Sequence, residues 1–164
     1  MTIRVGLGFD VHPFAPDRPL VLGGVTIPDA TGLAGHSDAD AVAHAVADAL
    51  LGAAGLPDLG TLYPASDDLH LGAASVGFLV EIARRLAADG WTVGNVDVVI
   101  AAEQPRLAPH VAAIATGVAQ ALEAARDPSD AVVAVSVTPK RGEGLGAIGR
   151  AEGIAAWAVA LLQR

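Results

Sequence analysis

The apolar positions of the 164-residue chain follow two periods, one typical of strands and one typical of helices. Alternating or continuous runs of Val, Ile and Leu predict four strands, at residues 2–9, 19–28, 91–102 and 131–137. Apolar residues three and four apart predict four helices: from Ser37, as N-cap, to Leu51, from Ser75 to Ala88, from Pro109 onward, and in the C-terminal segment that ends AAWAVALLQR. Residues 10–18 and 55–73 are expected to be loops.

Strands interspersed with helices in a chain of this length predict a single domain over residues 1–164. The expected fold class is α/β (α+β), a two-layer sandwich with a small four-stranded mixed sheet and helices on one face. The segments VVIAA and AVVAV are apolar on both sides, so the second sheet face also needs a cover. We expect copies of the chain to supply it, with their sheets packed together in a closed homo-oligomer.

The composition of the chain excludes several classes of partner. The formal charge of −8, from 10 Lys and Arg against 18 Asp and Glu, argues against a nucleic-acid partner. No cysteine is present, so a transition metal would need His, Asp or Glu ligands. The opening MTIRVGLGFD lacks the apolar stretch of a secretion signal, and no later run is long enough to span a membrane. We therefore expect a cytoplasmic protein.

Two segments supply candidate metal ligands. In an extended chain Asp10 and His12 point to the same face, and two imidazoles with one carboxylate form a three-ligand site if His44 joins them. Asp48, one helical turn after His44, is a candidate acceptor for its second ring nitrogen. The same residues also fit a polar strand end before Pro13 and a solvated helix face, and the pattern alone leaves both interpretations open.

Two further segments carry features of anion sites. His36 and Ser37 stand at the expected start of a helix, where backbone N–H groups favour a phosphate, although Ser37 also fits a plain N-cap. The stretch TPKRGEGLGAIGRAEG combines glycines with Lys140, Arg141 and Arg150, which suits either a phosphate site or a flexible connection. Glu143 there could hold a divalent cation or pair with an arginine. Together these features favour metal-dependent phosphoryl transfer on a small anionic substrate.

Motifs along nearly the whole chain are similar to those of one enzyme family. In order, GFDVHPF, LGGVTIP, GLAGHSDADAVAHAVADALLGAAGLPDLGTLYP, GNVDVVI, PRLAPH and GRAEGIA resemble 2-C-methyl-D-erythritol 2,4-cyclodiphosphate synthases of the non-mevalonate isoprenoid pathway. The resemblance implies conversion of 4-diphosphocytidyl-2-C-methyl-D-erythritol 2-phosphate to the cyclic diphosphate, with release of CMP. In this family the 2-phosphate of the substrate attacks its own β-phosphorus, so no covalent nucleophile is needed.

The resemblance also implies roles for individual residues. Zinc would be bound by Asp10, His12 and His44, and Mg²⁺ or Mn²⁺ by Glu143 together with the substrate phosphates. Catalytic roles fall on His36, at a phosphate-contacting position, and on Arg141, at the position that stabilises the transition state. The remaining substrate contacts fall on Ser37 at a phosphate, Asp58 and Gly60 at the ribose, a loop from Tyr63 to Asp67 over the methylerythritol, and Ala102, Arg106, Leu107 and Ala108 at the cytosine. The family is a homotrimer with active sites between subunits.

The chain departs from the family pattern mainly in one loop. PKRGE replaces the usual threonine run, so Lys140 and Arg141 stand where hydroxyls touch the nucleotide phosphates. Ala147 replaces a phenylalanine that lines the cavity on the trimer axis, Arg150 there is retained, and Arg106 replaces a lysine. Two alternatives to the cyclase follow: a non-catalytic zinc-containing trimer that binds nucleotide or isoprenoid diphosphate, and a hydrolase of other small diphosphates.

Overall fold

A computed structural model of the protein describes residues 1–64, 72–124, 126–127 and 131–164. Its sheet is mixed and has five strands in the order β2-β1-β5-β3-β4. Neighbouring strands are antiparallel except for β3 and β4, which are parallel. The strands are β1 (Ile3–Leu22), β2 (Val25–Leu33), β3 (Thr92–Ala101), β4 (Ala134–Lys140) and β5 (Gly153–Gln163).

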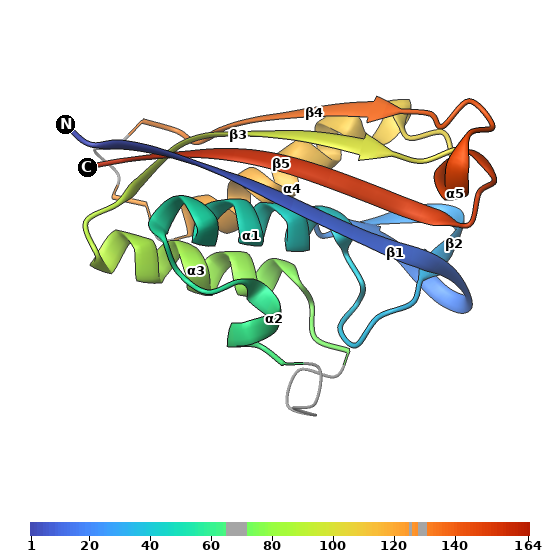
Figure 1. Ribbon diagram of the computed structural model, residues 1–164, viewed down its shortest axis with the longest axis horizontal. Coiled ribbons are helices and arrows are strands. Elements are labelled where there is room, and N and C mark those ends of the chain that lie inside the picture. The colour runs from blue at the N-terminus through green and yellow to red at the C-terminus, as the bar shows by residue number, and fades with distance from the viewer. Residues whose placement is uncertain (65–71, 125, 128–130) are drawn as a thin grey trace.

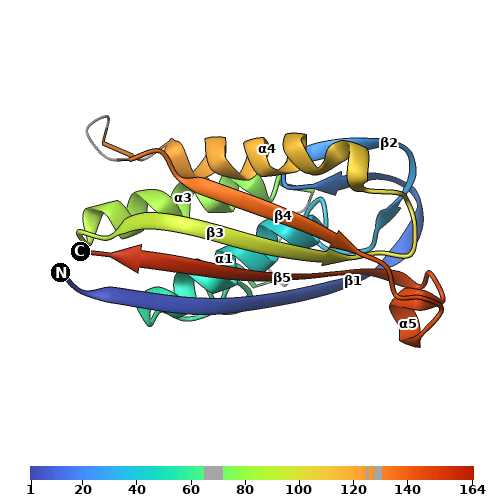
Figure 2. The same ribbon diagram turned by 90° about the horizontal axis from the view of Figure 1, so that it is seen from above.

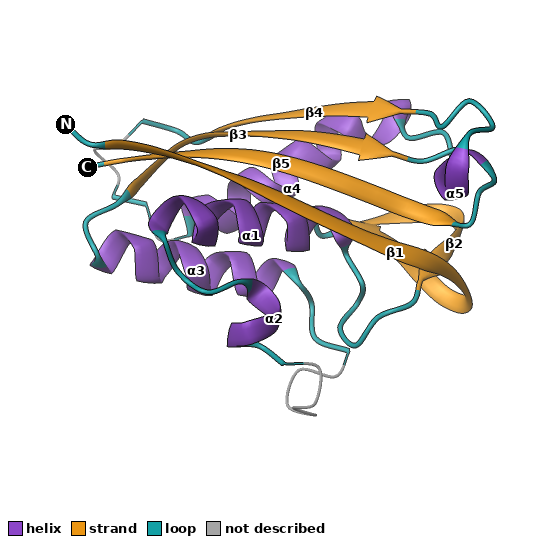
Figure 3. Ribbon diagram, viewed as in Figure 1, coloured by secondary structure: helices purple, strands orange, loops and turns teal. Residues whose placement is uncertain are grey.

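The longer helices pack on one face of this sheet, so the two layers expected from the sequence are confirmed (Figure 1). The view in Figure 2, from the sheet side, shows the opposite face of β1, β5 and β3 without helices over it. No helix among the described residues is long and apolar enough to cross a membrane. The helical segments are α1 (Ala41–Ala54), α2 (Leu59–Leu62), α3 (Val76–Ala88), η2 (Ala108–His110), α4 (Val111–Glu123) and α5 (Gly146–Gly149) (Figure 3).

The expectation of a C-terminal helix is wrong, because that segment forms the central strand β5. Its alanines favour a helix in isolation. In the fold, however, Ala156, Ala158 and Ala160 are buried while Trp157 and Val159 are 38% and 41% exposed, which is the two-residue period of a strand. The sheet therefore has five strands where the sequence predicted four.

The loop expected at residues 10–18 is also absent, because β1 continues through it. The strand pairs with β5 from Ile3 to Pro13 and then with β2 from Phe14 onward, with register shifts around Pro19. Asp10 and His12 therefore lie inside the strand, next to the point where its pairing partner changes. The strand expected at residues 19–28 is interrupted by a turn at Gly23 and Gly24, so its first part ends β1 and its second part begins β2. Strand β4 starts at residue 134 and not at 131.

Helix α1 begins three residues later than expected, because its N-cap is Asp40 rather than Ser37. The Asp40 carboxylate is fully buried and accepts N–H hydrogen bonds from Ala43 at 3.0 Å, Gly23 at 2.8 Å and Gly24 at 2.7 Å. It thus joins the helix to the turn between β1 and β2. The carboxylate therefore occupies the N-terminus of α1, three residues after Ser37.

We expect Asp40→Ala to lower the free energy of unfolding by about 3 kcal/mol, because two buried N–H groups and one partly buried N–H group would lose their acceptor. Urea denaturation measures this change. Asp40→Asn keeps one acceptor oxygen and is expected to cost less. A loss below about 1 kcal/mol in the alanine variant would show that the cap contributes little.

Two glycines of β1 allow α1 to lie directly on the strand. A Cβ atom at Gly8 would lie 1.9 Å from the Ala45 carbonyl oxygen, and one at Gly6 would lie 2.0 Å from that of Ala49. No side chain other than hydrogen fits there. Because side chains alternate along a strand, Asp10 and His12 continue the row of Gly6 and Gly8 and also face α1. This packing brings the helix residue His44 to them.

The other face of β1 and β5 is apolar and exposed. Phe9 and Trp157 lie side by side across the two strands, with ring centroids 5.0 Å apart. Leu7 and Val5 of β1 lie on the same face and are 68% and 63% exposed. A contiguous exposed surface of this kind marks a site of protein association. Its large side chains are Ile3, Val5, Leu7, Phe9, Val11, Trp157 and Val159, and we call these residues the open sheet face.

Candidate functional site

Three predicted ligands meet between β1 and α1. The Asp10 Oδ2 atom lies 2.9 Å from His12 Nε2 and 3.0 Å from His44 Nδ1, and the two ring nitrogens are 3.2 Å apart. Ligand atoms around a tetrahedral metal with bonds near 2.05 Å are about 3.3 Å apart. Three donors that converge at nearly this spacing, two nitrogens and one oxygen, could hold a divalent metal ion and leave a fourth position open.

The electrostatics of this group link the three residues. Burial alone would raise the pKa of Asp10, but hydrogen bonds with His12 and His44 and their positive charge outweigh it and hold that pKa well below its usual value. Burial alone would lower the pKa of His12, and the hydrogen bond with Asp10 and its negative charge raise it instead. The carboxylate is therefore ionised at neutral pH, as a metal ligand must be.

The second ring nitrogen of His44 contacts hydroxyls rather than the predicted Asp48. Its Nε2 atom lies 2.9 Å from Ser75 Oγ and 3.2 Å from Ser37 Oγ. Asp48 instead accepts the Leu59 N–H at 2.8 Å, so its expected role as partner of His44 is wrong. The contact with Ser75 could not be predicted from the sequence, because its position before α3 indicates only a helix N-cap.

A cavity of about 260 Å³ opens beside this cluster. His36 lines it, and the His36 Nε2 atom is buried with no hydrogen-bond partner among the described residues, as expected of a group that binds a ligand.

The other residues predicted for this site are only partly brought together. Asp58 does not line the cavity and instead caps α2 by accepting the Thr61 N–H at 2.8 Å. Asp67 lies outside the described residues. The predicted site residues brought together here are Asp10, His12, His36, Ser37, His44, Gly60 and Tyr63.

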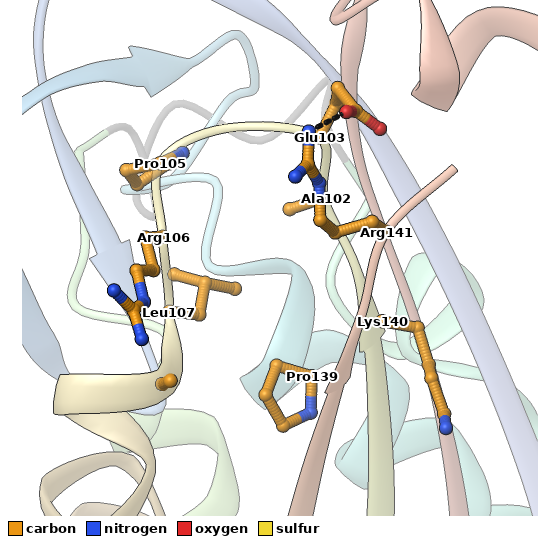
Figure 4. A pocket seen from close by; sticks show the side chains of 9 residues that line it. Ala102, Glu103, Pro105, Arg106, Leu107, Pro139, Lys140 and Arg141 are labelled. Atoms are coloured by element: carbon orange, nitrogen blue, oxygen red, sulfur yellow. Dashed lines mark hydrogen bonds and ion pairs between the residues drawn. The ribbon is translucent and has the colours of Figure 1, made fainter. Parts of the chain in front are cut away.

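A second cavity, of about 480 Å³, lies where β3 and β4 end (Figure 4). The two strands are parallel, so the segments that follow them leave the sheet at the same edge. The cavity combines an apolar wall with three cationic side chains, which suits a ligand with a flat apolar part and an anionic part. It brings together the predicted residues Ala102, Arg106, Leu107, Ala108, Lys140 and Arg141, and adds Glu103, Pro105 and Pro139, which sequence analysis did not single out.

Three other predicted residues line neither cavity. Glu143 is exposed and follows the second cavity along the chain, with a φ of 51°. Ala147 lies in α5 and is exposed, and Arg150 just after it pairs with Glu152 at 2.6 Å. Glu143 therefore does not line the cavity beside Asp10, His12 and His44 in this chain.

Comparison with known proteins places the chain in a family. The family model described as the YgbB family matches residues 3–163. The chain belongs to the YgbB family. A 2-C-methyl-D-erythritol 2,4-cyclodiphosphate synthase from Thermosynechococcus vestitus is 47% identical over 163 residues, which are 99% of this chain and 98% of that protein. The resemblance stated from the sequence motifs is therefore confirmed, and the chain is a member of a family of enzymes.

Solved structures of YgbB family members have the same fold. A 2C-methyl-D-erythritol-2,4-cyclodiphosphate synthase in a form bound to CDP is 34% identical, with a TM-score of 0.84 over 98% of this chain and 100% of that one. The bifunctional IspDF from Campylobacter jejuni is 38% identical, with a TM-score of 0.88 over 98% of this chain and 42% of that one.

Proposed function

We propose that this chain converts 4-diphosphocytidyl-2-C-methyl-D-erythritol 2-phosphate to 2-C-methyl-D-erythritol 2,4-cyclodiphosphate and CMP. The oxygen of the 2-phosphate forms a bond to the β-phosphorus, and the bond from that phosphorus to the bridging oxygen of CMP breaks. The observation that carries the proposal is the presence, in one chain, of a three-ligand metal cluster and of a cationic pocket with an apolar wall. Family membership and a relative's complex with CDP support it.

We assign zinc to Asp10, His12 and His44, because two imidazoles and a carboxylate suit it and no thiolate is available. Bound there, zinc would polarise a phosphate oxygen as a Lewis acid. Mg²⁺ or Mn²⁺ is assigned to Glu143 with the substrate phosphates. His36 is placed to donate to a phosphate through its free Nε2 atom, and Arg141 to stabilise negative charge on the reacting phosphates.

The larger cavity is assigned to the nucleotide. Its apolar wall, with buried Ala102 and Leu107, suits the face of cytosine, and backbone groups from there to Ala108 can hydrogen-bond the edge of the base. Lys140 and Arg106 neutralise the diphosphate. Ser37 is assigned to a phosphate, Asp58 and Gly60 to the ribose, and the loop from Tyr63 to Asp67 to the methylerythritol, while Ala147 and Arg150 are assigned to the trimer axis.

We further propose a homotrimer in which the metal ligands Asp10, His12 and His44 of one subunit face the nucleotide pocket of the next. The two cavities share no lining residue, and Glu143 lies in neither, so one subunit does not assemble a complete site. The open sheet face offers an apolar surface of the kind that subunits bury.

This arrangement predicts that Leu7→Lys dissociates the trimer, because a charge would enter the centre of the buried interface. Sedimentation velocity should then show a monomer, with CMP release lost as well. The matched control is Ala113→Lys on the exposed side of α4, which should stay trimeric. A trimer that survives Leu7→Lys would contradict the proposed interface.

The function is tested by CMP release from the diphosphocytidyl substrate, with zinc bound and magnesium varied. Magnesium-dependent release would support the cyclase and show that Lys140 and Arg141 can act where threonines are usual. Tight CDP binding without turnover would favour the non-catalytic binding protein. Release from diphosphates that lack the 2-phosphate would favour a hydrolase.

A further inference from the structure

Glu103 joins the two segments that form the larger cavity. It is the second residue after β3, and its carboxylate accepts a hydrogen bond from the Arg141 guanidinium through Oε1 and from the Gly142 N–H through Oε2 at 3.1 Å. Figure 4 shows the Arg141 side chain extended toward it across the top of the cavity. The Glu103 side chain is only 18% exposed, against 66% for Arg141, so the acid is the more fixed partner.

The charge of Glu103 is opposite to the one that an anion pocket needs. The hydrogen bond from Arg141, its positive charge and the backbone N–H groups of Gly142 and Glu143 hold the pKa of Glu103 below its usual value. The residue is therefore a carboxylate at neutral pH, in a cavity whose other charged side chains are the cations Arg106, Lys140 and Arg141. A carboxylate here repels a phosphate. Glu103 can therefore favour phosphate binding only indirectly, through the groups that it fixes in place.

The loop that Glu103 contacts needs an anchor in this chain. Lys140 and Arg141 have long side chains that lose much rotamer freedom when they are fixed, unlike the threonines expected at these positions. Gly142 packs against Gly149, since a Cβ at Gly142 would lie 2.4 Å from the Gly149 nitrogen. The loop is thus compact, and a carboxylate that binds two consecutive residues, Arg141 and Gly142, fixes its position relative to the Ala102 segment.

We propose that Glu103 is a positioning residue for the nucleotide phosphates. It holds Arg141 and the following backbone at the mouth of the cavity without contacting the ligand itself. Arg141 has five N–H donors, so a guanidinium held along one edge keeps others for a phosphate oxygen. Fixing it in advance removes part of the ordering cost of binding. The inference rests on the proposed function, because it takes a cytidine diphosphate as the ligand.

The test is the affinity of the intact protein for CDP, measured by calorimetry in magnesium buffer, for the wild type and two variants. Simple charge repulsion predicts tighter binding when the carboxylate is removed. Positioning predicts the opposite: about 5-fold weaker binding in Glu103→Gln and about 10-fold or more in Glu103→Ala, since the first keeps an acceptor for the Gly142 N–H. Cytidine, which has no phosphate, should bind each variant as it binds the wild type.

Asp89→Asn is the matched control, because it removes one exposed carboxylate at the other end of β3, about 30 Å along the strand direction. Its CDP affinity should stay within about twofold of the wild type, since exposed charges at that distance are screened. In an Arg141→Gln background, Glu103→Gln should cost less than it does alone, because the two residues act together.

CDP affinity that is unchanged or higher in both Glu103 variants would overturn the inference and leave the proposed function standing. Equal losses for CDP and cytidine would also overturn it, since they would mean a general distortion of the pocket. If the wild-type protein itself did not bind CDP, the proposed function would fail and this inference with it. Glu103→Gln is nearly isosteric, so the test holds even if the alanine variant does not fold.

Discussion

His44→Ala is expected to abolish stoichiometric zinc binding and nearly all CMP release while the protein stays folded. The variant removes one of three donors that lie within 3.2 Å of one another, and the remaining pair, Asp10 and His12, forms a much weaker site. Loss of a supporting contact alone costs metal affinity 10- to 100-fold, so loss of a ligand should cost more than about 100-fold. His44 is only partly buried at the edge of a cavity, so its truncation leaves the core of α1 in place.

Mass spectrometry after dialysis measures the zinc content of the variant. Circular dichroism and sedimentation show whether it stays folded. His110→Ala removes an imidazole outside the cluster and should retain one zinc per subunit. A His44→Ala protein that still carries one zinc per subunit would contradict the ligand assignment. A variant that unfolds would instead show that His44 is needed for the structure.

Gly8→Ala is expected to have the largest effect on stability, and to weaken zinc binding although residue 8 is not a ligand. The new Cβ would lie 1.9 Å from the Ala45 carbonyl oxygen and 2.6 Å from the Ala49 nitrogen. Both are backbone atoms of α1, so no side-chain rotation can relieve the clash. The helix must move away from β1, at a cost of at least about 3 kcal/mol. Because His44 sits on that helix and Asp10 on that strand, the same movement separates the ligands.

Gly52→Ala is the matched control for this variant. Gly52 also lies in α1, but a Cβ there would have no atom within 4 Å. It should raise the free energy of unfolding by about 0.5–1 kcal/mol, because alanine is favoured inside a helix. Thermal unfolding and zinc titration of both variants check the pair. Equal stability of Gly8→Ala and the wild type would show that α1 and β1 are not in the close contact described.

The three candidate metal ligands could be singled out from the sequence, but only the family resemblance put them together in one site. Asp10 and His12 share a face by the two-residue period of a strand, and His44 has helical neighbours that fix its orientation. The residues that support the cluster could not be predicted in this way. Ser75 meets His44 only through the packing of α3 beside α1, and Glu103 meets Arg141 only because β3 and β4 are parallel neighbours.

The errors in the fold have a similar cause. The alanine-rich segment 153–163 has helical propensity, and only its place between β1 and β3 makes it a strand. The start of α1 is set by Asp40, whose contacts with Gly23 and Gly24 come from another part of the chain. Strand β1 extends past Pro13 because it exchanges one partner for another, which a single segment of sequence does not reveal.

The most direct test of the cyclase is the product formed in water enriched in oxygen-18, analysed by mass spectrometry. Intramolecular attack by the 2-phosphate uses no water, so the account predicts the cyclic diphosphate and CMP, both without solvent oxygen. A linear methylerythritol bisphosphate, or CMP, that carries one oxygen-18 would mean that water is the nucleophile. That result would contradict the cyclase and favour a hydrolase with the same metal cluster.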